Sequence, residues 1–281
     1  MNAPRTDLKK TGFIAATVLA AIGYLLTPQH LSSQLVCCSG IPPVGCECGW
    51  YCSGAGQKWE CASCTPVLID VTGNGFSLTN AANGVWFDLS GRGTPRKMAW
   101  TSPASDDGFL AMDRNGNGLI DNGFELFGSV TPQPITRSPN GFLALGLLDM
   151  PDLGGNNDGV IDALDASFTK LRIWVDRNHD GTSAPNELLT MNDADILRLR
   201  FDYQTLRRED EYGNKFRYRA RIIGSRDSDI GRWAYDVIFV TDPNQNALSS
   251  RPPSDMWVTA QGEAAKALER FKCQSRCGSE K

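Results

Sequence analysis

Residues 176–187 are the stretch that most constrains this chain. They read Asp-Arg-Asn-His-Asp-Gly-Thr-Ser-Ala-Pro-Asn-Glu. Oxygen-bearing side chains stand at positions 1, 3 and 5, a glycine stands at 6 and a glutamate at 12, which is the pattern of a calcium loop of EF-hand type. A hard cation of this kind takes roughly six to eight oxygens, and the glycine allows the sharp turn that brings them together.

The ligands of this loop follow from the register. Position 9 is an alanine, so a water takes that place in the shell. The predicted ligands are the side chains of Asp176, Asn178, Asp180 and Glu187 and the backbone carbonyl of Thr182.

An earlier copy of the pattern lies at residues 113–125, with its closing glutamate one residue late. The inserted Gly123 is expected to absorb the extra residue, because glycine tolerates a sharp local turn. The apolar Ile120 stands at position 8, which faces a partner loop in paired sites of this type. The predicted ligands are Asp113, Asn115, Asn117, Asp121, Glu125 and the carbonyl of Leu119.

A third copy lies between these two, at residues 154–165. Its register places a glycine at position 1, so a side chain from Asp149 or Asp152 would have to reach in, and the sequence does not choose between them. The closing aspartate is shorter than a glutamate, which favours weak or magnesium-like binding. The predicted ligands are Asn156, Asp158, Asp162, Asp165 and the carbonyl of Val160.

Two weaker echoes precede these copies. Residues 70–75 keep oxygens at positions 1, 3 and 5 and are interpreted as a half-site, whereas residues 88–93 carry an arginine at position 5 and are interpreted as a turn. Aspartate, asparagine and glycine also build ordinary turns. Within residues 113–187, three copies each end in an acidic residue at or next to position 12. Ordinary turns do not explain this repetition well, and it favours calcium loops.

The blocks around these loops resemble a family of bacterial exported proteins with EF-hand-like calcium modules, similar to those found beside RTX (haemolysin-type) repeats. The resemblance runs through residues 106–118, 120–128, 140–145 and 171–176, and it covers roughly residues 66–240. It implies calcium binding and export, and it implies no catalytic activity. The middle copy also resembles half of a dockerin repeat, although the uneven spacing of the copies departs from a dockerin.

The N-terminal residues 1–30 are typical of an export signal. Arg5, Lys9 and Lys10 precede an apolar run over residues 13–26. That run is shorter than the ~20 residues needed to span a bilayer. No clear cleavage site follows, so an uncleaved N-terminal membrane anchor is the alternative. The predicted location is outside the cell, at its surface or in the periplasm.

The nine cysteines gather at the two ends of the chain. After an export signal they indicate disulfides, and a cross-link between the two ends is predicted. Zinc bound by the CxxC motif at residues 61–64 is the alternative. The odd number leaves one thiol free, intermolecular or modified. The disulfide candidates are Cys37, Cys38, Cys46, Cys48, Cys52, Cys61, Cys64, Cys273 and Cys277.

The chain is divided here into a cysteine-rich segment (31–65), a calcium-binding domain (66–242) and a linker with a C-terminal helix (243–281). The predicted fold class is α+β: short strands and an antiparallel β-meander around EF-hand-like calcium loops with short helices. Strands are expected at 66–71, 85–89 and 96–100. A short helix at 168–174 would be shared by two loops. The meander would comprise the alternating runs 197–203, 215–222 and 233–240, with one buried and one basic face.

No catalytic motif is visible in the sequence. The two histidines lie at position 30 and inside a calcium loop, and no Ser/His/Asp set or phosphate loop is present. We therefore expect a non-enzymatic, calcium-stabilised exported protein with a structural or binding role. A dockerin- or adhesin-like module is the alternative, and a calcium-dependent hydrolase is less favoured. The expected partners are calcium and a protein or glycan at the cell surface. The net charge of −4 argues against nucleic acid, and any membrane contact would come from the N-terminal segment.

Overall fold

The computed structural model describes residues 50–53, 58–61, 63–134, 136, 138–225 and 232–242, all within one compact unit. The strands are β1 (Trp50–Ser53), β2 (Lys58–Cys61), β3 (Val67–Ile69), β4 (Val85–Phe87), β5 (Arg96–Met98), β6 (Gly108–Met112), β7 (Val160–Ile161), β8 (Leu171–Trp174), β9 (Leu188–Thr190), β10 (Arg198–Arg200), β11 (Gln204–Glu209), β12 (Lys215–Ile223) and β13 (Arg232–Ile238). The helical elements are α1 (Gly141–Gly146) and the 3-10 turns η1 (Leu147–Asp149), η2 (Pro151–Leu153), η3 (Phe168–Lys170) and η4 (Pro185–Glu187).

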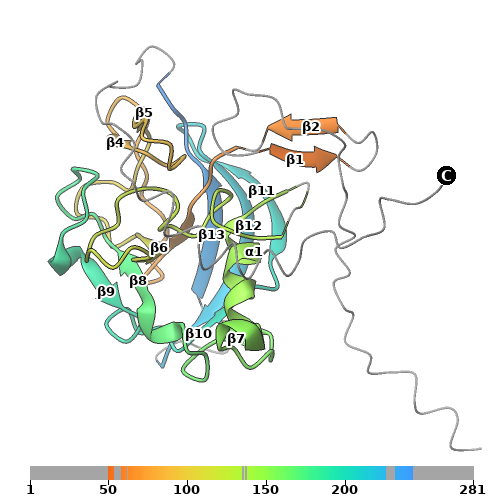
Figure 1. Cartoon of the computed structure of the whole chain (residues 1–281). Helices are drawn as coiled ribbons and strands as arrows, with labels where there is room; N and C mark the ends of the chain where they lie inside the picture. The colour runs from red at the N-terminus through yellow and green to blue at the C-terminus, as the bar shows by residue number, and fades with distance from the viewer. Residues whose placement is uncertain are drawn as a thin grey trace, which may run out of the picture. The chain divides into compact units, whose positions relative to one another are not determined.

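A nine-stranded sheet forms the body of the domain (Figure 1). Its order is β7-β10-β12-β13-β3-β6-β8-β9, and β11 pairs with β12 beside this path. Every neighbouring pair is antiparallel. Strand β3, which opens the domain, lies in the centre between β13 and β6. Two further hairpins are formed by β1 with β2 and by β4 with β5.

Both faces of the sheet are buried at its central strands β3 and β6, and each face carries its own hydrophobic cluster. In β3, Val67 and Ile69 face the first cluster while Leu68 faces the second. In β6 all five residues are buried. Because successive side chains of a strand point to opposite faces, a central strand covered on both faces must be apolar throughout.

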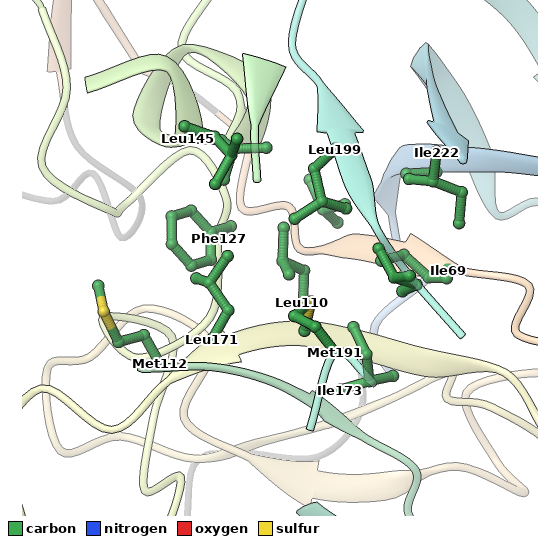
Figure 2. Close-up of a cluster of buried hydrophobic side chains, with 14 of the residues drawn as sticks. Ile69, Leu110, Met112, Phe127, Leu145, Leu171, Ile173, Met191, Leu199 and Ile222 are labelled. Carbon is green, nitrogen blue, oxygen red and sulfur yellow. The ribbon is translucent and has the colours of Figure 1, made fainter. Parts of the chain in front are cut away.

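The first cluster lies between the sheet and α1 with its neighbouring turns. Figure 2 shows Leu145 of α1 and Leu199 of β10 facing Leu110 and Ile173 of the sheet. Helix α1 is capped by Asn140, whose side chain accepts the N–H groups of two residues in the first turn. The second cluster is covered by the β4–β5 hairpin and by loops around it.

A buried ion pair holds the start of the domain to its end. Both Nε and Nη2 of Arg217 donate to Oδ1 of Asp236, at 3.0 and 2.7 Å. The other carboxylate oxygen accepts the hydroxyl of Thr65 at 2.9 Å and the N–H of Gly141 at 3.0 Å. This network joins β12, β13, α1 and Thr65, which lies two residues before β3.

The predicted α+β class with short helices around EF-hand-like loops is wrong. The described residues are mostly antiparallel β-structure with one short α-helix, and they contain no helix–loop–helix unit of EF-hand type. The helix expected at residues 168–174 is a 3-10 turn followed by β8. Leu171 and Ile173 face the first cluster and Trp174 faces the second. A strand buries side chains on both of its faces here, and this burial decides the structure of the segment despite the three-residue spacing that suggested a helix.

The three alternating runs do pair antiparallel through β10, β12 and β13, as expected, but their faces differ from the prediction. Phe216 is not on the same face as Tyr218, because the pairing of β12 with β13 shifts by one residue at Arg217. This bulge sends Phe216 into the second cluster and leaves Ala220 and Ile222 in the first.

Candidate functional site: three acidic loops

Three acidic loops carry the residues that the sequence singles out. Loop 1 (residues 113–125) follows β6, loop 2 (residues 149–165) begins at the end of η1 and contains β7, and loop 3 (residues 176–187) follows β8. Strands rather than helices lead into loops 1 and 3, so the rigid sheet fixes where each of these two loops begins.

The first carboxylate of each loop closes a turn on a glycine. In loop 1, Oδ2 of Asp113 accepts the N–H of Gly118 at 2.7 Å. In loop 3, Oδ2 of Asp176 accepts the N–H of Gly181 at 2.9 Å. Both glycines have positive φ angles, +84° and +72°, which other residues adopt only with strain. The glycine at position 6 is therefore required by the turn itself.

Loop 2 forms the same turn with a carboxylate from outside its register. Asp149 accepts the N–H groups of Asp158 at 3.2 Å and Gly159 at 2.9 Å. Asp149 is buried whereas Asp152 is exposed. The structure thus places Asp149, and not Asp152, in the role that Asp113 and Asp176 have in their loops. The sequence left this choice open.

The closing carboxylates also share one arrangement, in which each accepts two or three backbone N–H groups of its own loop. Glu125 accepts from Asp121 at 2.7 Å, and Glu187 accepts from Ala184 at 3.0 Å, both at position 9. Asp165 accepts from Asp162, again at position 9, at 2.8 Å. All three carboxylates are buried. The late position of the glutamate in loop 1 does not change its contacts.

The insertion at Gly123 is accommodated by close backbone packing rather than by a left-handed turn. Its N–H donates to the carbonyl of Asp88 at 2.9 Å, and a Cβ built on it would lie 1.8 Å from the carbonyl oxygen of Leu89. The turn at residues 88–93 thus packs against loop 1. Both upstream turns repeat the aspartate-to-glycine bond, from Gly75 to Asp70 and from Gly93 to Asp88, but each has alanine at position 12.

The middle of each loop is exposed and rich in amide and carboxylate oxygens. In loop 1 the side-chain amides of Asn115 and Asn117 both donate to Asp121. In loop 3 Asn178 donates to Asp180 at 2.8 Å. Within the described residues no three His, Cys, Asp or Glu side chains lie together as a ready metal-binding group. An ion would have to use asparagine and backbone oxygens as well, and it would displace some of these internal contacts.

Burial makes negative charge unfavourable at three of these carboxyls. Burial raises the pKa of Asp176, and the nearby charge of Glu187 adds to it. Burial likewise raises the pKa of Glu125 and of Asp165, each with a smaller contribution from neighbouring acids. Backbone N–H groups act in the opposite direction in all three. A positive ion bound beside any of these carboxyls would favour its charged form and so offset the cost of burying that charge.

Two contacts of loop 3 have partners that the sequence does not identify, although the register of loop 1 does predict that Ile120 faces a partner loop. The ring N–H of Trp100 donates to Oδ2 of Asp176 at 2.8 Å, and the hydroxyl of Ser183 accepts the N–H of Ile120 at 2.7 Å. Trp100 lies in the second cluster, close to Trp174. Both contacts join residues far apart in the chain, so local spacing could not reveal them.

Other sequence predictions lie largely outside the described residues. These include residues 1–30, the tail from 243, and Cys37, Cys38, Cys46, Cys48, Cys273 and Cys277. Cys52 and Cys61 lie on β1 and β2, and Cys64 is half-buried and disulfide-bonded. The disulfide scheme therefore stays a prediction. Among the described helices, none has the length and apolar character to cross a membrane.

Comparison with known proteins places the domain in a family. Iron-regulated protein FrpA of Neisseria meningitidis serogroup C is 37% identical to this chain over 151 residues, which is 53% of this chain and 13% of FrpA. This chain thus corresponds to a small part of that relative. The model of the SPM domain matches residues 67–240, from the first central strand to the end of the sheet. That match covers more than half of the sequence, and the chain belongs to the SPM-domain family.

Proposed function

We propose that this chain is an exported calcium-binding protein in which the acidic loops bind Ca²⁺ and thereby stabilise the sheet domain. The observation that carries the proposal is the repeated hydrogen-bond scheme of the three loops. In each, a first carboxylate is bonded to the glycine at position 6 and a closing carboxylate to the amide at position 9. Ordinary turns do not require a second, buried carboxylate at a fixed place after the turn.

The chemistry of the donor set favours calcium. The ligands available in loops 1 and 3 are carboxylate, amide and backbone carbonyl oxygens, which suit a hard cation. Asp176 and Glu187 are 1% and 2% exposed, and their charges repel each other. An ion held by Asp176, Asn178 and Asp180 and by the carbonyl of Thr182 would neutralise that repulsion. The bound ion would supply a fixed positive charge, and it would not itself imply a reaction.

The proposed place of action is outside the cytoplasm. Its support is the basic and apolar N-terminal pattern, the clustered cysteines and the resemblance to exported calcium modules. Calcium outside cells is near millimolar, so sites of ~10⁻⁵ M affinity would be filled and would serve folding rather than signalling. Fractionation of cells that express the full chain tests this directly. Recovery of the intact chain in the cytoplasm only would contradict export.

Calorimetric titration of the full chain with CaCl₂ tests calcium binding. The choice of Asp149 over Asp152 supplies a matched pair of variants. Asp149→Asn should remove one site, because it removes the first carboxylate of loop 2, which accepts the N–H of Gly159. Asp152→Asn should leave the number of sites unchanged, since that side chain is exposed. Melting curves of both variants check that they fold.

Two results would oppose the proposal. The first is the absence of both calcium heat and a calcium-dependent melting temperature in the folded chain. The second is an equal effect of the two variants, which would show that loop 2 does not use Asp149. Magnesium in place of calcium serves as a further control for loops 1 and 3, because Mg²⁺ demands a tighter octahedral shell than these flexible oxygen sets offer.

A further inference from the structure

A small pocket lies beside strands β11 and β13, which both pair with β12 (Figure 1). Its volume is about 180 Å³, and the turn at residues 70–76 completes its wall. Sites for drug-sized molecules measure roughly 300–1,000 Å³, so this pocket is of a size for one small unit, such as a single sugar ring. The side chains that line it include Asp70, Phe76, Arg208, Arg232, Trp233 and Tyr235.

Three half-buried aromatic rings form the apolar part of the pocket. Phe76 and Tyr235 meet edge to face, with their ring centroids 5.0 Å apart. Trp233 lies two residues before Tyr235 in β13 and therefore on the same face of the sheet. Aromatic rings offer large, rigid apolar contact areas, which suit the C–H faces of a sugar ring.

Arginine side chains gather on this same face. The register of β12 with β13 places Arg219 opposite Tyr235 and Arg221 opposite Trp233. The Cζ atoms of the two arginines lie 4.1 and 3.9 Å from the centroid of the Trp233 ring, and so within about 8 Å of each other. A guanidinium that stacks on an aromatic ring keeps its N–H groups in its own plane, where they can still bond an anion.

Arg208 supplies a positive charge at the pocket itself. It is exposed, and its Cζ atom lies 4.9 Å from the centroid of the Phe216 ring. Over the described residues, neither Arg208 nor Arg219 forms an ion pair with a carboxylate. The whole chain carries a net charge of −4, so this local surplus of positive charge opposes the balance of the molecule and is complementary to an anion.

The two remaining charged side chains of the pocket are already engaged. Arg232 donates to backbone carbonyl groups of two neighbouring segments and thereby fixes the wall. Asp70 accepts three N–H groups of its own turn, at 2.7, 3.1 and 2.7 Å. A carboxylate has about four lone-pair sites, which leaves one site of Asp70 for a hydroxyl group of a ligand.

We propose that this pocket binds a phosphorylated sugar, with the sugar ring against Phe76 and Tyr235 and the phosphate bonded to Arg208. A phosphate monoester carries about −1.5 to −2 charges at neutral pH and presents three acceptor oxygens, so it can bond more than one guanidinium at once. A carboxylate has two oxygens and a single charge, and it would balance less of the positive charge. Asp70 would accept a sugar hydroxyl. This binding goes beyond the proposed role of calcium and uses none of the proposed calcium ligands.

An NMR titration of the ¹⁵N-labelled full chain with glucose 1-phosphate tests the proposal. The indole N–H signal of Trp233, assigned through its loss in Trp233→Phe, reports on the pocket. Glucose and inorganic phosphate are the two halves of the probe, and glucuronate is its carboxylated counterpart, all at one ionic strength. We expect glucose 1-phosphate to shift the Trp233 signal saturably, with a Kd about tenfold or more below those of the other three probes.

Arg208→Gln should weaken the binding of glucose 1-phosphate by about tenfold or more, because a charge-assisted hydrogen bond is lost. Arg207→Gln is the matched control, since it removes the same charge from the adjacent exposed position of β11, outside the pocket. It should change the Kd by less than about twofold. Arg208→Lys keeps the charge without the planar fork of the guanidinium, and its affinity should lie between those of the native chain and Arg208→Gln. Melting curves check that each variant folds.

The possible outcomes are distinct. Inorganic phosphate that binds as tightly as glucose 1-phosphate would reduce the pocket to an adventitious anion site and overturn the sugar. Tighter binding of glucuronate would overturn the phosphate. Equal losses in Arg207→Gln and Arg208→Gln would show general attraction of charge and overturn the pocket, as would a Trp233 signal that responds to none of the probes. Because no proposed calcium ligand takes part, each of these results leaves the calcium proposal standing.

Discussion

The buried pair of Arg217 and Asp236 allows a quantitative test of how this domain is held together. Asp236 is fully buried and takes two bonds from the guanidinium of Arg217 and two from neutral donors. Arg217→Met keeps most of the side-chain length and removes the charge. The carboxylate would then remain in the interior with only the Thr65 hydroxyl and the Gly141 amide.

Breaking a buried pair from one side costs about 3–5 kcal/mol in free energy of unfolding, because the remaining charge is left uncompensated. For a domain of roughly 150–250 residues each kcal/mol lowers the melting temperature by about 2–4 °C. We therefore expect Arg217→Met to lower it by roughly 6–20 °C at neutral pH.

The loss should depend on pH with a defined sign. Burial raises the pKa of Asp236, and the charge of Arg217 lowers it; without Arg217 the pKa should rise further. A carboxyl whose folded pKa exceeds its unfolded value of ~3.9 binds its proton more tightly in the native state than in the unfolded chain. Its stabilising contribution is complete below the unfolded value and is lost as the pH rises through the folded pKa. The variant should be closest to the native protein near pH 4 and furthest from it at pH 7.

Urea unfolding of the full chain at several pH values between 4 and 7 measures this. Arg200→Met is the matched control, because Arg200 bonds the exposed Asp202 and surface pairs contribute about 0–1 kcal/mol. A loss in Arg217→Met no larger than that of the control, or a large loss that does not change with pH, would refute the reasoning.

Three further outcomes are expected. Removing calcium with EGTA should reduce the free energy of unfolding by about 2.7 kcal/mol for each site that was filled at 100-fold excess, and so lower the melting temperature. It should also shift the tryptophan emission through Trp100. An unchanged melting temperature after confirmed metal removal would show that the loops are only turns. Glu187→Gln should weaken calcium binding more than Asp165→Asn in a calorimetric titration, because the longer carboxylate closes the shell more fully; equal losses would reject this order. Gly123→Ala should cost about 1–3 kcal/mol in urea unfolding, since its Cβ would meet the Leu89 carbonyl at 1.8 Å, and native stability would show that this contact relaxes freely.

The acidic turns could be predicted from the sequence because their chemistry is local. A carboxylate at position 1 and a glycine at position 6 define a turn whatever lies around it. Glu125, one residue late, accepts backbone N–H groups of its own loop as Glu187 does, and its role as a metal ligand stays a prediction. Asp149 could not be assigned, because the insertion before Gly159 breaks the spacing. Distances between candidate oxygens do not follow from spacing either, so occupancy of the loops by a metal remains a proposal.

The fold was less predictable because it depends on contacts between distant residues. Phe168, Leu171 and Trp174 recur at a helical spacing, yet they lie on a turn and a strand. Strand alternation puts Leu171 and Trp174 on opposite faces, and the presence of a second core explains why both are buried. The bulge at Arg217 is equally invisible in the sequence, since Phe216 fits the alternation of its neighbours until the partner strand is known.

The central place of β3 has a consequence for the order of events during synthesis. Among the strands of the nine-stranded sheet, β3 is translated first, but one of its two partner strands, β13, is translated last. The middle of the sheet therefore cannot close until almost the whole domain has left the ribosome. Such long-range pairing folds slowly. If the chain is exported as proposed, slow folding would keep it unfolded until it enters a translocation channel. A domain truncated before Arg232 should remain open at β3 and be degraded rather than accumulate.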